Sequence, residues 1–491
     1  MKRCLASLLL ICLSTYGARA ADWNQWRGPN RNGATAESPP LTSSLPAMGL
    51  KPLWVSTEQI PAGRAGGWSS PIVADGRVFL FVHQRVRVGD EPLPKRKFPW
   101  LAPDKRGGMT AQEYQDYEVN RRDEDQMLGR FYRYADVVYC MSASTGKPIW
   151  TTQINSVYTR FPQSGSPAVV NGKVYVLGAA YTARCLDAES GKELWKSKLP
   201  GEFRDQSMQS SFVVADGVAV ILSGKLFGLN ADTGKVLWSV GEEEARQLHS
   251  SPAIWETGDR HLAISNVPGG QTVCVDIRSG EQLWKVASMS GHSSPTVVGD
   301  RLLTYGSSRK GGLRCYKLSP AGAEHVWTFN GAADSGSCPV VVGDYAYVQG
   351  ERRLACVNLE TGDEEWMTTL DLGRPRYTSL VAADNKVYYA FDGVLCFAAT
   401  ADAYTQLIKA KIDRNALMAD EAAFRKLLGI DQLGKTGEDK KKADRVWRAS
   451  FSGAGPLPCA TPAIVDGKLF VRLNDSVVCY DLRAPRTSAK D

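Results

Sequence analysis

Two histidines begin the same four-residue phrase, His-Ser-Ser-Pro, at His249 and His292. Histidine is the side chain that most readily changes charge near neutral pH, and it also ligates metals, so two histidines in equivalent positions could bind a ligand. The same position, three residues before a proline or a similar anchor, recurs eight times. It is occupied by Trp68, Ser164, Gln209, His249, His292, Gly336, Tyr377 and Cys459. Whether these side chains meet depends on the elements that carry them.

An eleven-residue phrase repeats in the same chain, as in CLDAESGKELW, GLNADTGKVLW and CVDIRSGEQLW. Asp or Asn early in such a phrase starts a turn, and a glycine with positive φ closes it, so each phrase predicts a hairpin with a tryptophan on its second strand. The turn glycines are Gly146, Gly191, Gly234, Gly280 and Gly362. The tryptophans that we assign to the ends of the repeats are Trp54, Trp150, Trp195, Trp238, Trp284, Trp327, Trp366 and Trp447.

A second phrase precedes each hairpin, as in GSPAVVNGKVYVL, and consists of a short strand, a tight turn and another alternating strand. Four short strands in about 40–45 residues are typical of one β-propeller blade. The second phrase occurs eight times, and the last unit lacks a terminal tryptophan, which Trp54 near the N-terminus can supply. The sequence therefore predicts an all-β, eight-bladed propeller of four-stranded antiparallel blades, whose last blade is closed by the N-terminal strand.

Two intervals exceed the repeat length, at about residues 84–135 and 401–445, and both have helical patterns. In the first interval, Thr110 and Glu113 have the spacing of a capping box. We expect two helical insertions that interrupt blades between strands. The expected organisation is a signal peptide at 1–20, an N-terminal extension at 21–49 and the propeller at 50–491.

The first twenty residues have the pattern of a secretory signal: a basic start, an apolar stretch and small residues before a cleavage site near Ala20–Ala21. The apolar stretch is too short to span a bilayer, and Cys12 follows Ile11 where a lipid-anchor site wants a small residue. The formal net charge of +7 argues neither for nucleic acid nor for a polybasic membrane surface. Most cysteines recur at one repeat position, where they should be buried rather than paired.

These repeats resemble the pyrroloquinoline quinone (PQQ) repeat, whose signature is (D/N)-x-x-(T/S)-G-x-x-x-W, and the resemblance covers about residues 50 to 482. The family includes quinoprotein alcohol dehydrogenases and non-catalytic relatives such as the BamB-type outer-membrane assembly factor. The opening DWNQWRGPNRNG also resembles the start of exported bacterial proteins of this type. The resemblance implies that the dehydrogenases hold PQQ and Ca²⁺ on the propeller axis, with an Asp base and, in many, a disulfide between adjacent cysteines.

Several marks of catalysis are absent from this sequence: it has no adjacent cysteines, no CxxCH, and no EF-hand, P-loop or zinc spacing. We therefore favour a non-catalytic, monomeric propeller scaffold that is exported and binds a protein or glycan partner. The alternative is a PQQ-dependent dehydrogenase that oxidises an alcohol or a sugar at a degenerate axial site. No metal site is assigned, and no nucleic-acid partner is expected.

The first strand of each propeller blade lines the axis, so the eight repeated positions should surround one mouth of the channel. The candidate ligand-binding residues there are Trp68, Gln209, His249, His292 and Tyr377. Arg64, Arg160, Arg204 and Arg376 lie just upstream, and they should add positive charge that suits an anionic ligand, or a peptide or glycan with carboxylates. A channel that holds only water, as in many propellers, is the other interpretation.

Overall fold

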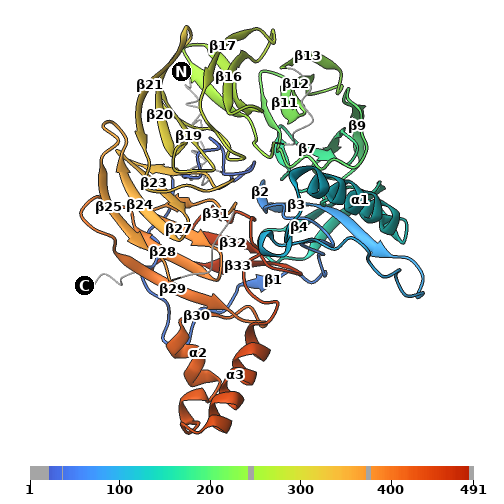
Figure 1. The fold of residues 1–491 in the computed structure, drawn as a ribbon. Coiled ribbons are helices and arrows are strands. Elements are labelled where there is room, and N and C mark those ends of the chain that lie inside the picture. The colour runs from blue at the N-terminus through green and yellow to red at the C-terminus, as the bar shows by residue number, and fades with distance from the viewer. Residues whose placement is uncertain (1–21, 36, 242–247, 372–376, 486–491) are drawn as a thin grey trace, which may run out of the picture.

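Eight antiparallel sheets form a closed ring in the computed structural model, which describes residues 22–485 except 36, 242–247 and 372–376 (Figure 1). Each sheet begins with the strand that follows one of the eight anchors, and consecutive first strands are neighbours around the axis. The predicted all-β, eight-bladed propeller is confirmed.

The first four blades, numbered along the chain, each contain four consecutive strands. Blade one has β2 (Ile72–Ala74), β3 (Arg77–Arg87), β4 (Tyr132–Ser142) and β5 (Pro148–Asn155). Blade two has β6 (Ala168–Val170), β7 (Lys173–Gly178), β8 (Thr182–Asp187) and β9 (Glu193–Lys198). Blade three has β10 (Val213–Ala215), β11 (Val218–Ser223), β12 (Lys225–Asn230) and β13 (Val236–Val240). Blade four has β14 (Ala253–Thr257), β15 (Arg260–Val267), β16 (Gln271–Asp276) and β17 (Gln282–Ala287).

The remaining blades complete the ring. Blade five has β18 (Thr296–Val298), β19 (Arg301–Tyr305), β20 (Leu313–Ser319) and β21 (Gly322–Phe329). Blade six has β22 (Val340–Val342), β23 (Tyr345–Gly350), β24 (Arg353–Asn358) and β25 (Glu364–Thr369). Blade seven has β26 (Val381–Ala383), β27 (Lys386–Ala390), β28 (Val394–Ala398), β29 (Gln406–Ile412) and the short β30 (Met418–Ala419). Blade eight has β31 (Ala463–Val465), β32 (Lys468–Arg472), β33 (Val477–Asp481) and β1 (Trp54–Val55).

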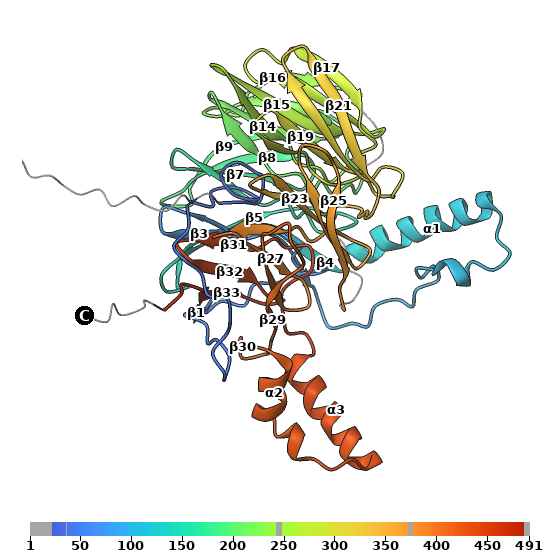
Figure 2. The same ribbon diagram turned by 90° about the vertical axis from the view of Figure 1, so that its left-hand side faces the viewer.

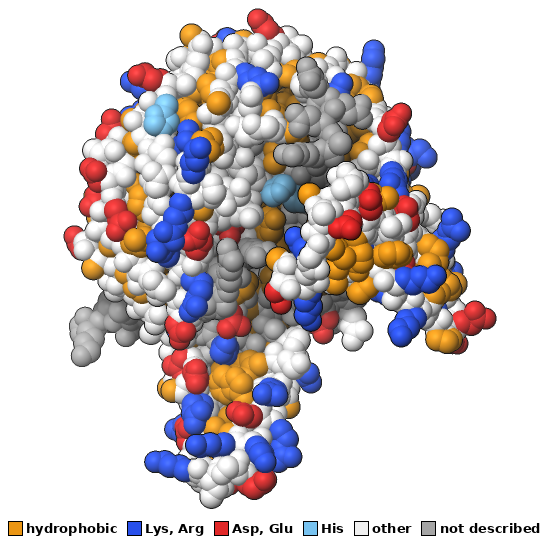
Figure 3. Space-filling view, in the orientation of Figure 1, with side chains coloured by type: hydrophobic (Ala, Val, Ile, Leu, Met, Phe, Trp, Pro, Cys, Tyr) orange, Lys and Arg blue, Asp and Glu red, His pale blue; other side chains and the backbone are white. Residues whose placement is uncertain are grey.

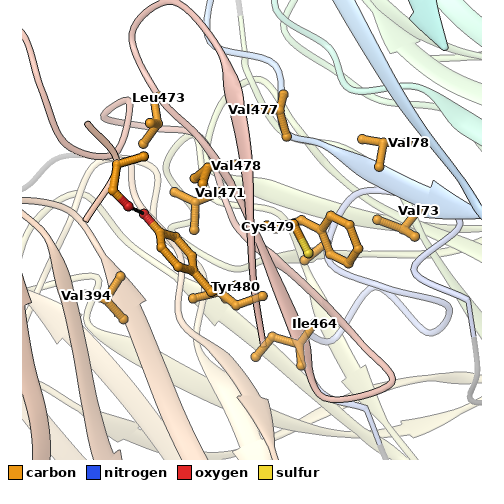
Figure 4. Close-up of a cluster of buried hydrophobic side chains, with 14 of the residues drawn as sticks. Val73, Val78, Val394, Ile464, Val471, Leu473, Val477, Val478, Cys479 and Tyr480 are labelled. Carbon is orange, nitrogen blue, oxygen red and sulfur yellow. Dashed lines mark hydrogen bonds between the residues drawn. The ribbon is translucent and has the colours of Figure 1, made fainter. Parts of the chain in front are cut away.

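The N-terminal strand closes blade eight, as predicted, because Trp54 pairs with Cys479 and Val55 with Val478. The closure lies in the largest group of buried apolar side chains, which joins blades seven, eight and one. Figure 4 shows Val477, Val478, Cys479 and Tyr480 of β33 within this group. The two ends of the propeller are therefore joined by both backbone pairing and hydrophobic burial.

Five of the repeat tryptophans, Trp54, Trp150, Trp195, Trp238 and Trp327, pack against the turn glycine of the next blade. A Cβ atom added at Gly191, where φ is +71°, would lie 2.5 Å from Cε3 of Trp150. The Trp150 indole N–H also donates to the Ala188 carbonyl of that turn, at 3.2 Å. Equivalent indole hydrogen bonds of 2.8–3.0 Å are made by Trp54, Trp195, Trp238, Trp327 and Trp366.

Blade five does not offer this hydrogen bond to the tryptophan of the preceding blade. Its β20–β21 hairpin turns tightly between Ser319 and Gly322 and lacks the longer glycine turn. Within the described ranges, the buried indole N–H of Trp284, which precedes this blade, has no hydrogen-bond acceptor. The tight turn of blade five thus offers no carbonyl to Trp284, whereas the longer turn of blade seven offers that of Thr400 to Trp366 at 2.8 Å without a glycine.

The prediction that Trp447 ends a blade was wrong. Trp447 lies in α3 (Gly437–Phe451), where its ring is 4.5 Å from that of Phe451. Ile408 of β29 occupies the blade position instead, opposite Cys396. The segment that we expected to be helical from residue 401 therefore begins with the outer strand of blade seven. The second insertion follows that strand and separates two blades, whereas the first interrupts blade one between β3 and β4.

The helices lie outside the ring. α1 (Ala111–Gly129) begins with the capping box of Thr110 and Glu113 and is preceded by a short 3-10 turn, η1 (Pro103–Lys105). α2 (Glu421–Leu427), η2 (Ile430–Gln432) and α3 form a helical hairpin that projects from the rim, while α1 extends from one face of the ring (Figure 2). None of the helices in the described part of the chain has the length and apolar character needed to cross a membrane.

Replacement of Gly191 by Ala should lower the free energy of unfolding by about 2–4 kcal/mol, because the new methyl group meets the Trp150 ring at a positive φ. Gly172→Ala is the matched control: Gly172 has φ +72° but nothing within 4 Å, so only the conformational cost of about 1 kcal/mol applies. Urea unfolding of both variants measures the difference. Equal losses would contradict the assigned role of the tryptophan contact.

Candidate functional site

A belt of small side chains encircles the axis one residue before each anchor. The backbone N–H of one belt residue donates to the side chain of the belt residue on an adjacent blade, at 2.8–3.2 Å. Seven such bonds link the belt residues Ser70, Ser166, Ser211, Ser251, Ser294, Cys338, Ser379 and Thr461. These small side chains fit between the crowded inner strands and accept their backbone N–H groups. They thereby link neighbouring blades around the channel.

A cavity of about 330 Å³ lies on the axis beside this belt. The eight positions singled out in the sequence all line it, together with four belt serines, Trp26 and Phe161. The structure thus brings together the candidates Trp68, Gln209, His249, His292 and Tyr377. Figure 3 shows the face that carries α1, with histidine side chains in the hollow near its centre.

His249 and His292 are in direct ring contact in the lining. Their rings stack with centroids 4.6 Å apart and planes inclined by 27°. The backbone N–H of His249 donates to Nδ1 of His292 at 3.3 Å, so this nitrogen must be unprotonated. Burial, with a smaller contribution from the neighbouring His292, lowers the pKa of His249 to about 4, and burial lowers the pKa of His292. Both rings are therefore neutral near pH 7.

Tyr377 extends this aromatic arc across blade six. Its ring is 6.1 Å from His292 and fills the space that a side chain at Gly336 would occupy, since a Cβ there would lie 2.0 Å from Cδ1 of Tyr377. Tyr377 has φ of +63°, an unfavourable conformation for a bulky residue. The buried Asp334 carboxylate holds it there by accepting the backbone N–H groups of Gly336, Ser337 and Tyr377 at 2.7–3.2 Å.

The predicted arginines surround the mouth, but α1 engages two of them. Arg160 pairs with Glu118 at 3.3 Å, and Arg204 pairs with Asp123. Arg64 lies over the Phe161 ring, 4.5 Å from its centroid. These arginines are not among the residues that line the cavity.

The first insertion brings the carboxylates of Glu118 and Asp123 to two of these arginines. Its own Arg122 pairs with Asp205, which fastens α1 to the loop before blade three. Attraction of an anion to this mouth stays a prediction. Arg376, the fourth arginine of the prediction, lies outside the described residues.

The N-terminal extension forms the other end of the cavity. Arg27 and Arg31 are fully buried beneath the belt, and their guanidinium groups donate mainly to backbone carbonyls of the inner strands. Arg27 reaches Thr296 at 2.9 Å and Pro339, while Arg31 reaches Pro252 at 2.7 Å and Phe212. Burial lowers the pKa of both groups, to about 9 for Arg31. Trp26, which precedes Arg27 in the chain, lines the cavity.

Sequence reasoning missed Trp26 and Phe161 because neither belongs to the repeat. The signal that could have found Trp26 is the pair of tryptophans and arginines in DWNQWRGPNRNG, a polar extension with no other reason to contain them. Its glycines Gly28 and Gly33 both have φ of +82°, which permits the two tight bends that return the chain beneath the ring.

The lining does not fit a PQQ–Ca²⁺ site. Ca²⁺ prefers several carboxylate and carbonyl oxygens, yet the described lining residues include no carboxylate, and the nearby Asp334 already accepts three backbone N–H groups. No group of three or more His, Cys, Asp or Glu side chains among the described residues has the geometry of a metal site. All nine cysteines in that part of the chain are free thiols, and burial raises the pKa of Cys459, in the lining, to about 12.

Comparison with known proteins places these features in a family. A family model described as outer membrane protein assembly factor BamB matches residues 129–320 and 314–408. BamB from Nitrosomonas eutropha is 23% identical over 221 residues, which are 42% of this chain and 50% of that protein. The match therefore spans only half the length of this curated relative.

Two solved structures share the fold. A europium-containing methanol dehydrogenase superposes with a TM-score of 0.55 at 11% identity, over 94% of this chain and 98% of its own. The quinohemoprotein alcohol dehydrogenase of Comamonas testosteroni superposes with a TM-score of 0.52 at 12% identity, over 96% and 82%. At such identities the likeness shows the eight-bladed fold alone.

His249→Gln should make the free energy of unfolding less dependent on pH below about pH 7. The unfolded chain binds a proton at His249 near pH 6.5 but the folded chain only near pH 4, so the stability of the wild type falls as the pH drops through this window. The difference between wild type and variant should grow from zero above pH 7 to about 2–3 kcal/mol at pH 4. Urea unfolding across this range measures it, and parallel curves would contradict a neutral, buried His249.

Arg27→Ala should destabilise the ring by about 2–4 kcal/mol, because four hydrogen-bond acceptors lose their donor in a buried place. Arg309→Ala is the control, since the Arg309 side chain is 47% exposed in its pair with Glu351 and should contribute less than about 1 kcal/mol. Thermal unfolding compares the two. Similar melting temperatures would show that the N-terminal extension does not hold the blades together.

Proposed function

Because the chain belongs to the family described as outer membrane protein assembly factor BamB, we propose that it is a non-catalytic propeller scaffold for protein partners in outer-membrane protein assembly. The observation that carries this proposal is the match of that family model over more than half of the chain. The Nitrosomonas relative bears the same description. The predicted signal at residues 1–20 agrees with an exported protein of the periplasm or the cell exterior.

The nature of the axial lining supports a binding role over a catalytic one. Its histidines are stacked on each other and held neutral, and its cysteine is a protonated thiol. A general base or nucleophile is most effective when its pKa is near the working pH, whereas burial lowers the pKa of His249 to about 4 and raises that of Cys459 to about 12. A scaffold needs only a rigid ring and accessible surfaces. The belt and the tryptophan contacts make the ring rigid.

The two insertions are the surfaces that distinguish this chain from the bare repeat. α1 is fastened to the mouth by ion pairs such as Arg122–Asp205. The α2–α3 hairpin instead packs on itself, through Phe424, Trp447 and Phe451, and none of the α3 side chains is fully buried. A self-packed projection from the rim is suited to contact a second protein without disturbing the ring, and we assign it that role.

Deletion of the gene from its own host should lower the amount of folded outer-membrane β-barrel proteins. The measurement is the heat-dependent shift of these proteins on a gel, with the full chain re-expressed as the positive control. A chain that lacks residues 1–20 should fail to restore them, because it stays inside the cell. Unchanged folded barrels in the deletion strain would contradict the proposed function.

Two further experiments test which part of the protein acts and whether it is instead a dehydrogenase. A chain in which a short Gly-Ser linker replaces residues 421–451 should fold but restore the barrels poorly if the hairpin docks a partner, whereas full restoration would refute the role of the hairpin. Titration of the purified mature chain with PQQ and Ca²⁺ tests the competing dehydrogenase. Saturable one-to-one binding of PQQ with reduction of a dye in the presence of an alcohol would favour that enzyme over the scaffold.

A further inference from the structure

The axial cavity presents hydrogen-bond donors that the protein does not use. The hydroxyl oxygens of Ser70, Ser166, Ser211 and Ser251 each accept a backbone N–H from an adjacent blade. Nothing in the described ranges accepts their own hydroxyl protons, and all four residues line the cavity. Four O–H donors on consecutive blades therefore face one side of an enclosed space.

The same cavity contains polar atoms that lack any partner. Gln209 donates through Nε2 to the Pro162 carbonyl at 3.1 Å, which leaves Oε1 as a buried acceptor with no donor among the described residues. His249 Nδ1 is also buried and without a partner in that part of the chain. Buried polar atoms are costly unless they are satisfied, so these atoms call for a ligand or water that offers both donors and acceptors.

The walls between these polar atoms are aromatic. Trp26, Trp68, Phe161 and Tyr377 line the cavity together with the two stacked histidines. Tyr377 is held in its strained conformation by the Asp334 carboxylate, which also accepts the backbone N–H groups of Gly336 and Ser337. Strained residues at a cavity wall are typical of sites that bind something.

The distribution of charge around the cavity favours an uncharged ligand. None of the described lining residues is an Asp, Glu, Lys or Arg, and the mouth arginines Arg160 and Arg204 already pair with carboxylates of α1. An ion that entered this cavity would lose its hydration without meeting an opposite charge. The volume of about 330 Å³ is at the small end of ligand pockets, which hold about 300–1,000 Å³.

We propose that the axial cavity is a binding site for an uncharged, polyhydroxylated ring, the chemistry of a neutral sugar. Aromatic side chains stack on the apolar faces of the ring, and its hydroxyl groups accept from the belt serines and donate to Gln209. This inference does not depend on the scaffold function, because a ligand on the axis and a protein partner on the rim use different surfaces.

Titration of the mature chain with glucose, N-acetylglucosamine and maltose tests the site, by calorimetry and by saturation-transfer NMR. At least one of these sugars should bind saturably with a Kd of roughly 1 mM or tighter. Glucuronate, the anionic analogue of glucose, should bind at least tenfold more weakly than glucose. Absence of binding by all three neutral sugars would overturn the proposal and leave a cavity that holds water, and equal binding of glucuronate would overturn the argument from charge.

Matched variants assign any binding to the cavity. Trp68→Ala and Gln209→Leu should each weaken binding at least tenfold while circular dichroism and the melting curve show a folded ring. The controls are Trp100→Ala and Gln112→Leu, whose side chains are exposed on the first insertion and should leave the affinity unchanged. Binding that persists unchanged in Gln209→Leu and Trp68→Ala would place the sugar elsewhere and refute the axial site.

Discussion

The contact between a tryptophan and the turn glycine of the next blade is the interaction on which the whole ring depends. A blade alone has two faces to cover, and this contact buries one of them against its neighbour in a fixed geometry. The indole N–H bonded to a turn carbonyl sets the height of one blade relative to the next, as in Trp195 to Ala231 and Trp238 to Ile277. Where the neighbouring turn has another shape, the indole N–H of Trp284 has no acceptor among the described residues.

Because the blades are held at their outer strands in this way, the inner strands meet closely at the axis. Only small side chains fit there, and the serine belt turns that crowding into hydrogen bonds between blades. The residues two positions before each belt residue then surround the axial cavity. Their identities vary because the belt residues, and not these lining residues, link the blades.

The N-terminal extension and the first insertion add side chains to the two ends of the axial channel, whose described lining residues carry no charge near pH 7. Buried Arg27 and Arg31 tie the extension to the inner strands of blades three to six and place Trp26 across the axis. On the opposite side, carboxylates of α1 pair with the arginines of the mouth. Two segments outside the repeat thus decide what the axis can bind, while the repeat itself decides only where the axis lies.

The sequence by itself determined the number of blades, the closure by Trp54 and the eight residues around the mouth. These follow from local hairpin chemistry that repeats in the same register, so one hairpin predicts the others. Tertiary structure decided the rest. It put Ile408 in a blade where the sequence suggested Trp447, because a helix and a strand can both carry a tryptophan at the expected distance.

It also decided the charge of the mouth and the protonation of His249, because ion pairing and desolvation depend on which distant segments pack together. No repeat encodes where an insertion or an extension will fold back, and for that reason the floor of the cavity and its neutrality were visible only in three dimensions.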